Sequence, residues 1–144
     1  MNILIKEINM KKISFQLFQD NNMIGILDTT IRNLDDNEKD FIKKKGVPDE
    51  TLDLLSCNID WIEIYKDKIK YKPNFRIGSY FLNYCILYIQ SKYNVKFSTL
   101  DNCIDSLFSK GKSNINFYKD LGYDWIDFDY IENKPNGPEM IKIL

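Results

Sequence analysis

The middle of the chain alternates strand-like and helix-like sequence in an order that restricts the possible folds. Residues Ile59 to Lys66 alternate apolar and polar side chains as a β-strand does, and Val95 to Leu100 has the composition of a second strand. Between them, apolar residues recur at helical spacing from Gly78 to Tyr93. Strands joined through a helix are usually parallel neighbours, because the crossover returns the chain to the same sheet. This order therefore predicts a parallel strand pair covered by a helix.

The first part of the chain favours antiparallel strands. Ile3 to Ile8 and Lys12 to Gln19 have strand-like patterns, and in the second of these Ile13, Phe15 and Leu17 alternate with Ser14, Gln16 and Phe18. Asp20-Asn21-Asn22 supplies a turn, because Asn tolerates positive φ. The chain is therefore expected to continue as a hairpin into Met23 to Asp28.

Two short helices are predicted in the segment from Leu34 to Asn58. Asp35-Asp36 can cap a first helix that runs through Lys45 and ends at Gly46. Pro48-Asp49 can start a second helix, which would contain Leu52, Leu54 and Leu55.

The C-terminal part predicts one more helix and a final strand pair. Asn114 to Leu121 suits a short helix ended by Gly122, followed by strands at Trp125 to Ile131 and Glu139 to Leu144. The whole pattern predicts one α/β (α+β) domain over residues 1–144, with a mixed, mostly antiparallel sheet and flanking helices.

Composition excludes several classes of protein. The 20 basic and 21 acidic residues nearly cancel, and no apolar stretch is long enough to cross a bilayer, so neither nucleic acid nor membrane is an expected partner. Cys57, Cys85 and Cys103 form no Cys-x-x-Cys pair, which argues against a disulfide framework and a zinc site and favours a reducing cytoplasm. The chain contains no histidine. Catalysis would therefore depend on a carboxylate, tyrosine, lysine, thiol or backbone group, and no metal is expected.

The turn before the central helix has the residues of a phosphate site. In Asn74 to Ser79, Gly78 permits close approach of a ligand to the backbone, and the Ser79 hydroxyl can donate a hydrogen bond. Arg76 can pair with a phosphate. Gly-Ser is also an ordinary helix start, so the turn alone leaves a simple helix cap open.

Three segments follow one another in the order Arg76-Ile77-Gly78-Ser79-Tyr80-Phe81-Leu82, Ile115 to Tyr123, and Pro138 to Leu144. In this order they resemble the GNAT superfamily of acyl-CoA-dependent N-acetyltransferases. The first is similar to the family's pyrophosphate-binding segment, the second to its Phe-Tyr-x-x-Leu-Gly-Phe/Tyr helix end, and the third to its last strand. The sequence departs from the family pattern at Pro73, Arg76 and Gly111, where the family has a Gln or Arg, a Gly and often an Asn, respectively.

The resemblance implies two central parallel strands that splay apart and hold acetyl-CoA between them. The implied cofactor-binding residues are Ile64 and Tyr65 on the first strand, Phe75, Arg76, Ile77, Gly78 and Ser79 at the turn, and Asn114. Tyr118 would protonate the departing thiolate, and Glu63 would take the proton of the amine. The alternatives are a core aromatic residue for Tyr118 and a solvent-facing or salt-bridged carboxylate for Glu63.

The implied activity is transfer of an acetyl group from acetyl-CoA to a primary amine, either a small molecule such as a polyamine or a protein amine. Asp127 and Asp129 could face a cationic amine, or could be the wet face of the sheet. A catalytically weak or inactive GNAT-fold binding or structural module is the alternative. In the structural version, the segment from Leu34 to Asn58 would form an interface, for example in a homodimer.

Overall fold

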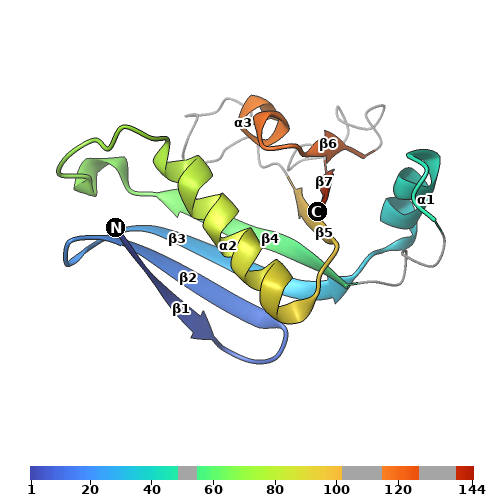
Figure 1. The fold of residues 1–144 in the computed structure, drawn as a ribbon, viewed down its shortest axis with the longest axis horizontal. Coiled ribbons are helices and arrows are strands. Elements are labelled where there is room, and N and C mark those ends of the chain that lie inside the picture. The colour runs from blue at the N-terminus through green and yellow to red at the C-terminus, as the bar shows by residue number, and fades with distance from the viewer. Residues whose placement is uncertain (49–54, 102–114, 127–138) are drawn as a thin grey trace.

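The computed structural model describes residues 1–48, 55–101, 115–126 and 139–144. The strands of the described residues form one seven-stranded sheet in the order β1-β2-β3-β4-β5-β7-β6 (Figure 1). The strands are β1 (Asn2–Glu7), β2 (Lys12–Gln19), β3 (Asn22–Asn33), β4 (Leu55–Ile64), β5 (Phe97–Asp101), β6 (Asp124–Trp125) and β7 (Glu139–Ile143). The helices are α1 (Asp36–Lys44), α2 (Ile77–Tyr93), α3 (Ile115–Asp120) and the short 3-10 helix η2 (Lys66–Lys68).

The antiparallel N-terminal half is confirmed. β1 pairs with β2, and β2 pairs with β3, through tight connections. The left-handed residue of the second turn is Asp20, with φ of 56°, rather than either asparagine that follows it. β3 continues to Asn33, beyond the predicted end at Asp28, because it pairs with β2 on one side and β4 on the other.

The predicted parallel pair is also confirmed, and it is short. β4 pairs with β5 from Ser56 opposite Phe97 to Ile59 opposite Leu100. β4 then continues to Ile64, whereas β5 ends at Asp101. The two strands are therefore paired only at one end of β4 within the described part of the chain, as a splayed pair requires.

The start of β4 corrects one prediction. Leu55, which was predicted in a helix, is the first residue of β4 and pairs with Asn33 of β3. The rest of that second predicted helix, residues 49–54, lies outside the described residues. Leu55 is in a strand rather than a helix because it pairs with β3. Pairing of this kind often overrides a weak local preference.

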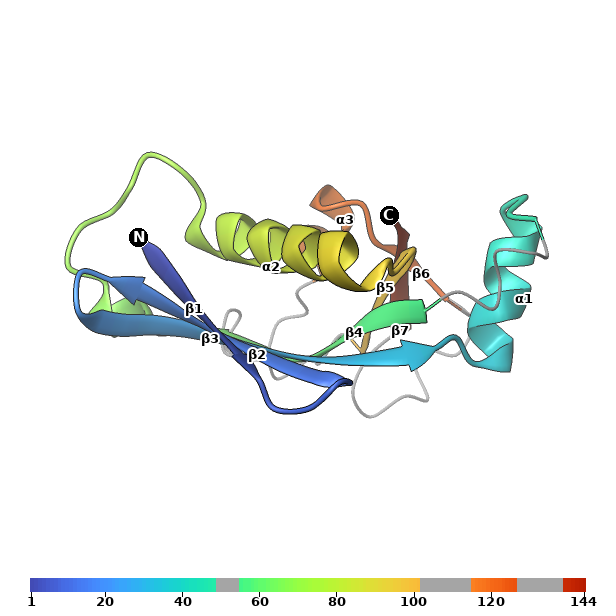
Figure 2. The same ribbon diagram turned by 60° about the horizontal axis from the view of Figure 1, so that its bottom comes forward.

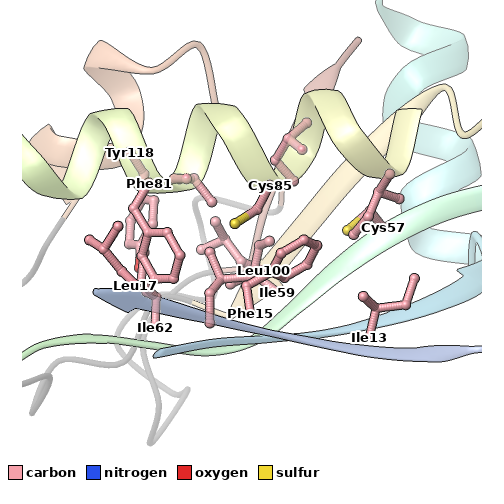
Figure 3. Packing of buried hydrophobic residues seen from close by; sticks show 14 of the residues in the cluster. Ile13, Phe15, Leu17, Cys57, Ile59, Ile62, Phe81, Cys85, Leu100 and Tyr118 are labelled. Carbon is pink, nitrogen blue, oxygen red and sulfur yellow. The ribbon is translucent and has the colours of Figure 1, made fainter. Parts of the chain in front are cut away.

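Helix α2 covers one face of the sheet, as the helical spacing predicted. Figure 2 shows it lying along the strands, and Figure 3 shows the packing of its buried side against them. Phe81 and Cys85 are fully buried and lie in one cluster with Phe15 and Ile59 of the sheet. The helix ends at Tyr93, where Asn94 adopts the left-handed conformation with φ of 53°.

Helix α1 forms between β3 and β4 with the predicted caps. The Asp35 side chain accepts a hydrogen bond from the Glu38 amide, and the Glu38 side chain accepts one from the Asp35 amide, each at 2.8 Å. Gly46 follows the helix with φ of 88°. β1 and β2 are joined by residues 8–11 alone, so the helix lies later in the chain than the first two strands.

The last helix and strand pair follow the predicted order. α3 is followed by Gly122, with φ of 96°, and β6 pairs antiparallel with β7. β6 ends at Trp125, so the predicted strand does not include Ile126, and its predicted continuation over residues 127–131 lies outside the described residues. Among the helices that are described, none has both the length and the apolar character that crossing a membrane requires.

Candidate functional site

A cleft of about 650 Å³ lies at the end of β4, beyond the residues of this strand that pair with β5. Its walls come from the end of β4, the loop that follows it, the beginning of α2 and the helix α3. The residues that line it are Ile64, Lys66, Ile69, Lys72, Pro73, Phe75, Arg76, Ile77, Gly78 and Phe117. This volume is within the range of small-molecule and cofactor sites. Among these described residues the charged ones are all cationic.

The beginning of α2 presents backbone amides to the cleft. Arg76 is the N-cap, its backbone is extended, and no side chain caps the helix. The first backbone hydrogen bond of the helix runs from the Tyr80 amide to the Arg76 carbonyl, at 3.0 Å. The amides of Ile77, Gly78 and Ser79 therefore precede the hydrogen-bond ladder and point out of the helix, where the helix dipole favours an anion.

Among the described residues, no strand pairs with β4 beyond Ile59 on the side of β5. The Tyr65 amide donates to the Ile24 carbonyl of β3 at 2.8 Å, so it is already engaged. Successive residues of a strand direct their peptide groups to opposite neighbours. The peptide group of Ile64 therefore faces the gap, and the Ile64 side chain lines the cleft. Of the two predicted positions on this strand, Ile64 is the one that can pair with an extended ligand.

Glu63 lies on the other face of β4 from Ile64. It accepts a hydrogen bond at 3.1 Å from the indole nitrogen of Trp61, whose side chain is exposed. Burial, with a smaller contribution from the Glu63 carboxylate, raises the pKa of the Tyr65 hydroxyl. The predicted shared face of Trp61, Glu63 and Tyr65 therefore exists. Glu63 is outside the lining of the cleft, on the opposite face of the strand.

Tyr118 is next to a cleft residue and is itself buried. Its side chain is only 6% exposed, and its ring lies 5.1 Å from the ring of Phe117 and 5.9 Å from that of Tyr123. Phe117 lines the cleft, while Tyr118 belongs to the core beneath it (Figure 3). The Tyr123 hydroxyl shares a hydrogen bond of 2.6 Å with the Ser98 hydroxyl. Burial raises the pKa of the Tyr123 hydroxyl. The role of Tyr118 stays a prediction.

Some predicted site residues cannot be placed, and some site residues were not predicted. Asn114, Asp127 and Asp129 lie outside the described residues. The turn residues Phe75, Arg76, Ile77 and Gly78 come together at the cleft. Four further residues line the cleft without having been predicted, namely Lys66, Ile69, Lys72 and Phe117. The repeated lysines between β4 and α2 were the available signal for two of them.

Comparisons with known proteins identify the fold. No protein family and no curated protein sequence matches the chain. Among solved structures, the PaiA N-acetyltransferase from Thermoplasma acidophilum in complex with coenzyme A is 13% identical with a TM-score of 0.58. The match covers 94% of this chain and 63% of that one, so this chain spans less than two thirds of that protein.

Two further structures show the same likeness. Aminoglycoside 6'-acetyltransferase type Ii is 15% identical with a TM-score of 0.56, over 94% of this chain and 70% of that chain. FeeM, an N-acyl amino acid synthase from uncultured soil microbes, is 11% identical with a TM-score of 0.58, over 94% of this chain and 73% of its own. The chain therefore has the fold of the GNAT acetyltransferases, as the three sequence segments predicted.

Proposed function

We propose that this protein transfers an acyl group from a coenzyme A thioester to a primary amine, with acetyl-CoA as the donor. The observation that carries the proposal is the position of the cleft. It joins the uncapped beginning of α2 to the stretch of β4 that has lost its parallel partner. An anion site beside a free strand edge suits a ligand with a diphosphate at one end and an amide-containing arm at the other.

The donor is proposed to lie along this path. Its diphosphate would accept hydrogen bonds from the amides of Ile77, Gly78 and Ser79, beside Phe75 and Arg76. The pantetheine amides would pair with the backbone of Ile64, which faces the gap. The thioester would then enter the gap past the end of the parallel pairing, and its carbonyl would be accessible from the opposite face of the sheet.

The chemistry is a direct attack by the amine on the thioester carbonyl. The nucleophile must be neutral, although an alkylamine with a pKa of about 10.4 is mostly protonated at neutral pH. Glu63, directly or through water, would take this proton on the face that the thioester reaches. Collapse of the tetrahedral intermediate breaks the carbon–sulfur bond, and Tyr118 would give a proton to the coenzyme A thiolate.

An amine acceptor fits the charges on the Glu63 face. Asp28 and Asp60, together with one cation, Lys12, line a separate hollow of about 270 Å³ on the sheet, and the exposed ring of Trp61 lies beside Glu63. Carboxylates and an aromatic face attract a cation. One of the solved structures of this fold is named as an aminoglycoside acetyltransferase. A small amine such as a polyamine, or a protein amine, is the proposed acceptor class.

Calorimetry with acetyl-CoA, followed by a thiol-release assay with a panel of amines, tests the proposal. We expect binding, and turnover that falls by about 10²- to 10⁴-fold in Glu63→Gln, because a positioned base contributes on that order. Asp20→Asn is the matched control, since it removes one carboxylate at the exposed β2–β3 turn. Absence of acetyl-CoA binding at high micromolar concentration would end the proposal.

A second candidate is an acyl-CoA-binding module without catalysis. The burial of Tyr118 and the presence of Pro73 in the cleft favour it, because the first limits access to the thiolate and the second has no amide to donate. It predicts acetyl-CoA binding with no amine-dependent release of thiol. Robust turnover that is lost in Tyr118→Phe would rule it out.

A further inference from the structure

The loop between β4 and α2 is held in place from the neighbouring hairpin. Gln19, fully buried at the end of β2, donates from its amide nitrogen to the Tyr71 carbonyl and accepts from the Lys70 amide, both at 2.8 Å. Asn22, at the start of β3, donates to the Lys68 carbonyl at 2.7 Å. Both polar groups of a buried side chain are thus used to fix this one loop. Its backbone has a defined position before any ligand binds.

The loop that is held this way is strongly cationic. From Lys66 to Lys72 it contains four lysines and one aspartate, and Arg76 follows before α2. Lys66, Lys72 and Arg76 line the cleft. Lys68 lies over the ring of Tyr65 at 5.0 Å, and Lys70 is exposed outside the lining. Two lysines of the loop therefore face the cleft, and the others do not.

The same region lacks part of the backbone that could bind a phosphate. Pro73 has no amide hydrogen, and Arg76 occupies a position where a glycine would let a ligand approach the backbone closely. The exposed Arg76 guanidinium lies 4.0 Å from the Asp120 carboxylate, so part of its charge is already countered. Lys66 and Lys72 are the remaining cations of the lining.

We propose that Lys66 and Lys72, presented by a loop that Gln19 and Asn22 hold in place, bind the phosphates of coenzyme A. Side-chain charge would then supply much of the recognition that backbone amides give elsewhere. This inference rests on the proposed function and deepens it. Contacts between exposed cations and phosphate are screened by salt, whereas amide hydrogen bonds to a bound phosphate depend on salt much less. Binding of coenzyme A should therefore weaken markedly as salt increases.

Calorimetric titration with free coenzyme A tests this at about 50 mM and about 300 mM salt, which differ strongly in screening. The variants are Lys66→Ala, Lys72→Ala and the double variant, with Lys70→Ala as the matched control from the same loop. At low salt we expect each single variant to bind about three- to tenfold more weakly than the control, as for an exposed charge-assisted contact. The double variant should lose most of the salt dependence.

The outcomes separate this inference from the proposed function. If wild-type protein binds coenzyme A but the double variant matches Lys70→Ala at both salt concentrations, the lysine inference is overturned and the acyl-carrier proposal stands. If wild-type protein does not bind coenzyme A, both are overturned. Titration with dephospho-coenzyme A identifies the phosphate. Loss of the variant effect assigns the lysines to the 3′-phosphate, and an unchanged effect assigns them to the diphosphate.

Discussion

An ion pair between Arg32 and the buried Glu38 lies at the end of β4 where β4 and β5 are still paired, which we call the closed end. Removal of this ion pair should measurably destabilise the fold. The Glu38 carboxylate of α1 is fully buried and accepts hydrogen bonds from both terminal nitrogens of Arg32, at 2.7 and 2.8 Å. Arg32 also donates to Asn58 of β4 at 3.2 Å and to Thr99 of β5 at 3.0 Å. Asn58 and Thr99 are partners in the parallel pairing and share a hydrogen bond of 2.8 Å. We call these four residues the Arg32 network.

The substitution Glu38→Gln removes the charge from this network with little change in volume. Breaking a fully buried ion pair typically costs about 3–5 kcal/mol. The Arg32 side chain is 32% exposed and can regain some hydration, so we expect about 2–3 kcal/mol. For a chain of this size that corresponds to a fall in Tm of about 6–10 °C. Asp36→Asn, an exposed acid in the same helical turn, is the control and should cost about 0.5 kcal/mol.

The dependence of stability on pH gives an independent test of the network. Burial by itself raises the pKa of Glu38, but its hydrogen bonds with Arg32, with the Glu139 side chain and with the Asp35 amide outweigh it and hold this pKa below its ordinary 4.5. A lowered pKa stabilises the fold above pH 4.5, and this contribution is lost as the pH falls towards the folded value. Thermal unfolding between pH 7 and pH 3 should show this loss in wild type and much less of it in Glu38→Gln. A Tm within about 2 °C of the control at neutral pH would refute the reasoning.

Three further changes test the core and the site. A Cβ at Gly25 would lie 2.9 Å from the Ile64 Cδ1 and 3.1 Å from the Glu63 carbonyl oxygen. Because that oxygen belongs to the backbone of β4, it cannot move aside as a flexible side chain would. Gly25→Ala should therefore lower the free energy of unfolding, measured with urea, by about 1–3 kcal/mol. Burial raises the pKa of Cys57 to about 12, so mass-mapped alkylation at pH 8 should modify it only after denaturation, and stoichiometric labelling of native protein would contradict this burial. Tyr118→Phe should lower kcat while leaving the Kd for acetyl-CoA within about twofold, because it removes a proton donor and keeps the ring; unchanged kcat would exclude that role.

Much of the fold could be predicted from the sequence because its signals are local. The alternation of Ile13, Phe15 and Leu17 sets the buried face of β2, and the helical spacing from Phe81 onwards sets that of α2. The limits of β3 and β4 were less accurate. The predicted end of β4 at Lys66 was wrong: the strand ends at Ile64, and Lys66 is the first residue of η2. β3 ends later and β4 begins earlier than their own patterns indicate, because each gains hydrogen bonds from strands on both sides. Such pairing cannot be identified before the topology is known.

The candidate site was predictable only where it coincides with a local motif. The turn at Arg76 to Gly78 has a recognisable sequence, and the structure places it at the cleft. Gln19 forms hydrogen bonds with Lys70 and Tyr71, which are separated from it by 51 and 52 positions in the sequence. No periodicity in the sequence indicates contacts over such a separation. The Arg32 network likewise depends on three strands and a helix meeting.

These two long-range arrangements explain how a gap can persist in a sheet whose strands would otherwise continue to pair. At the closed end, the Arg32 network fixes the parallel register through Asn58 and Thr99. Towards the open end, β4 stays paired with β3 as far as Ile64. The loop that follows is then held by Gln19, which directs the chain away from β5 and towards the beginning of α2. Within the part of the chain that the structure describes, the unpaired end of β4 and the first turn of α2 consequently border the same cleft. Loss of the Arg32 network, or of the hydrogen bonds between Gln19 and the loop, should therefore impair ligand binding as well as stability.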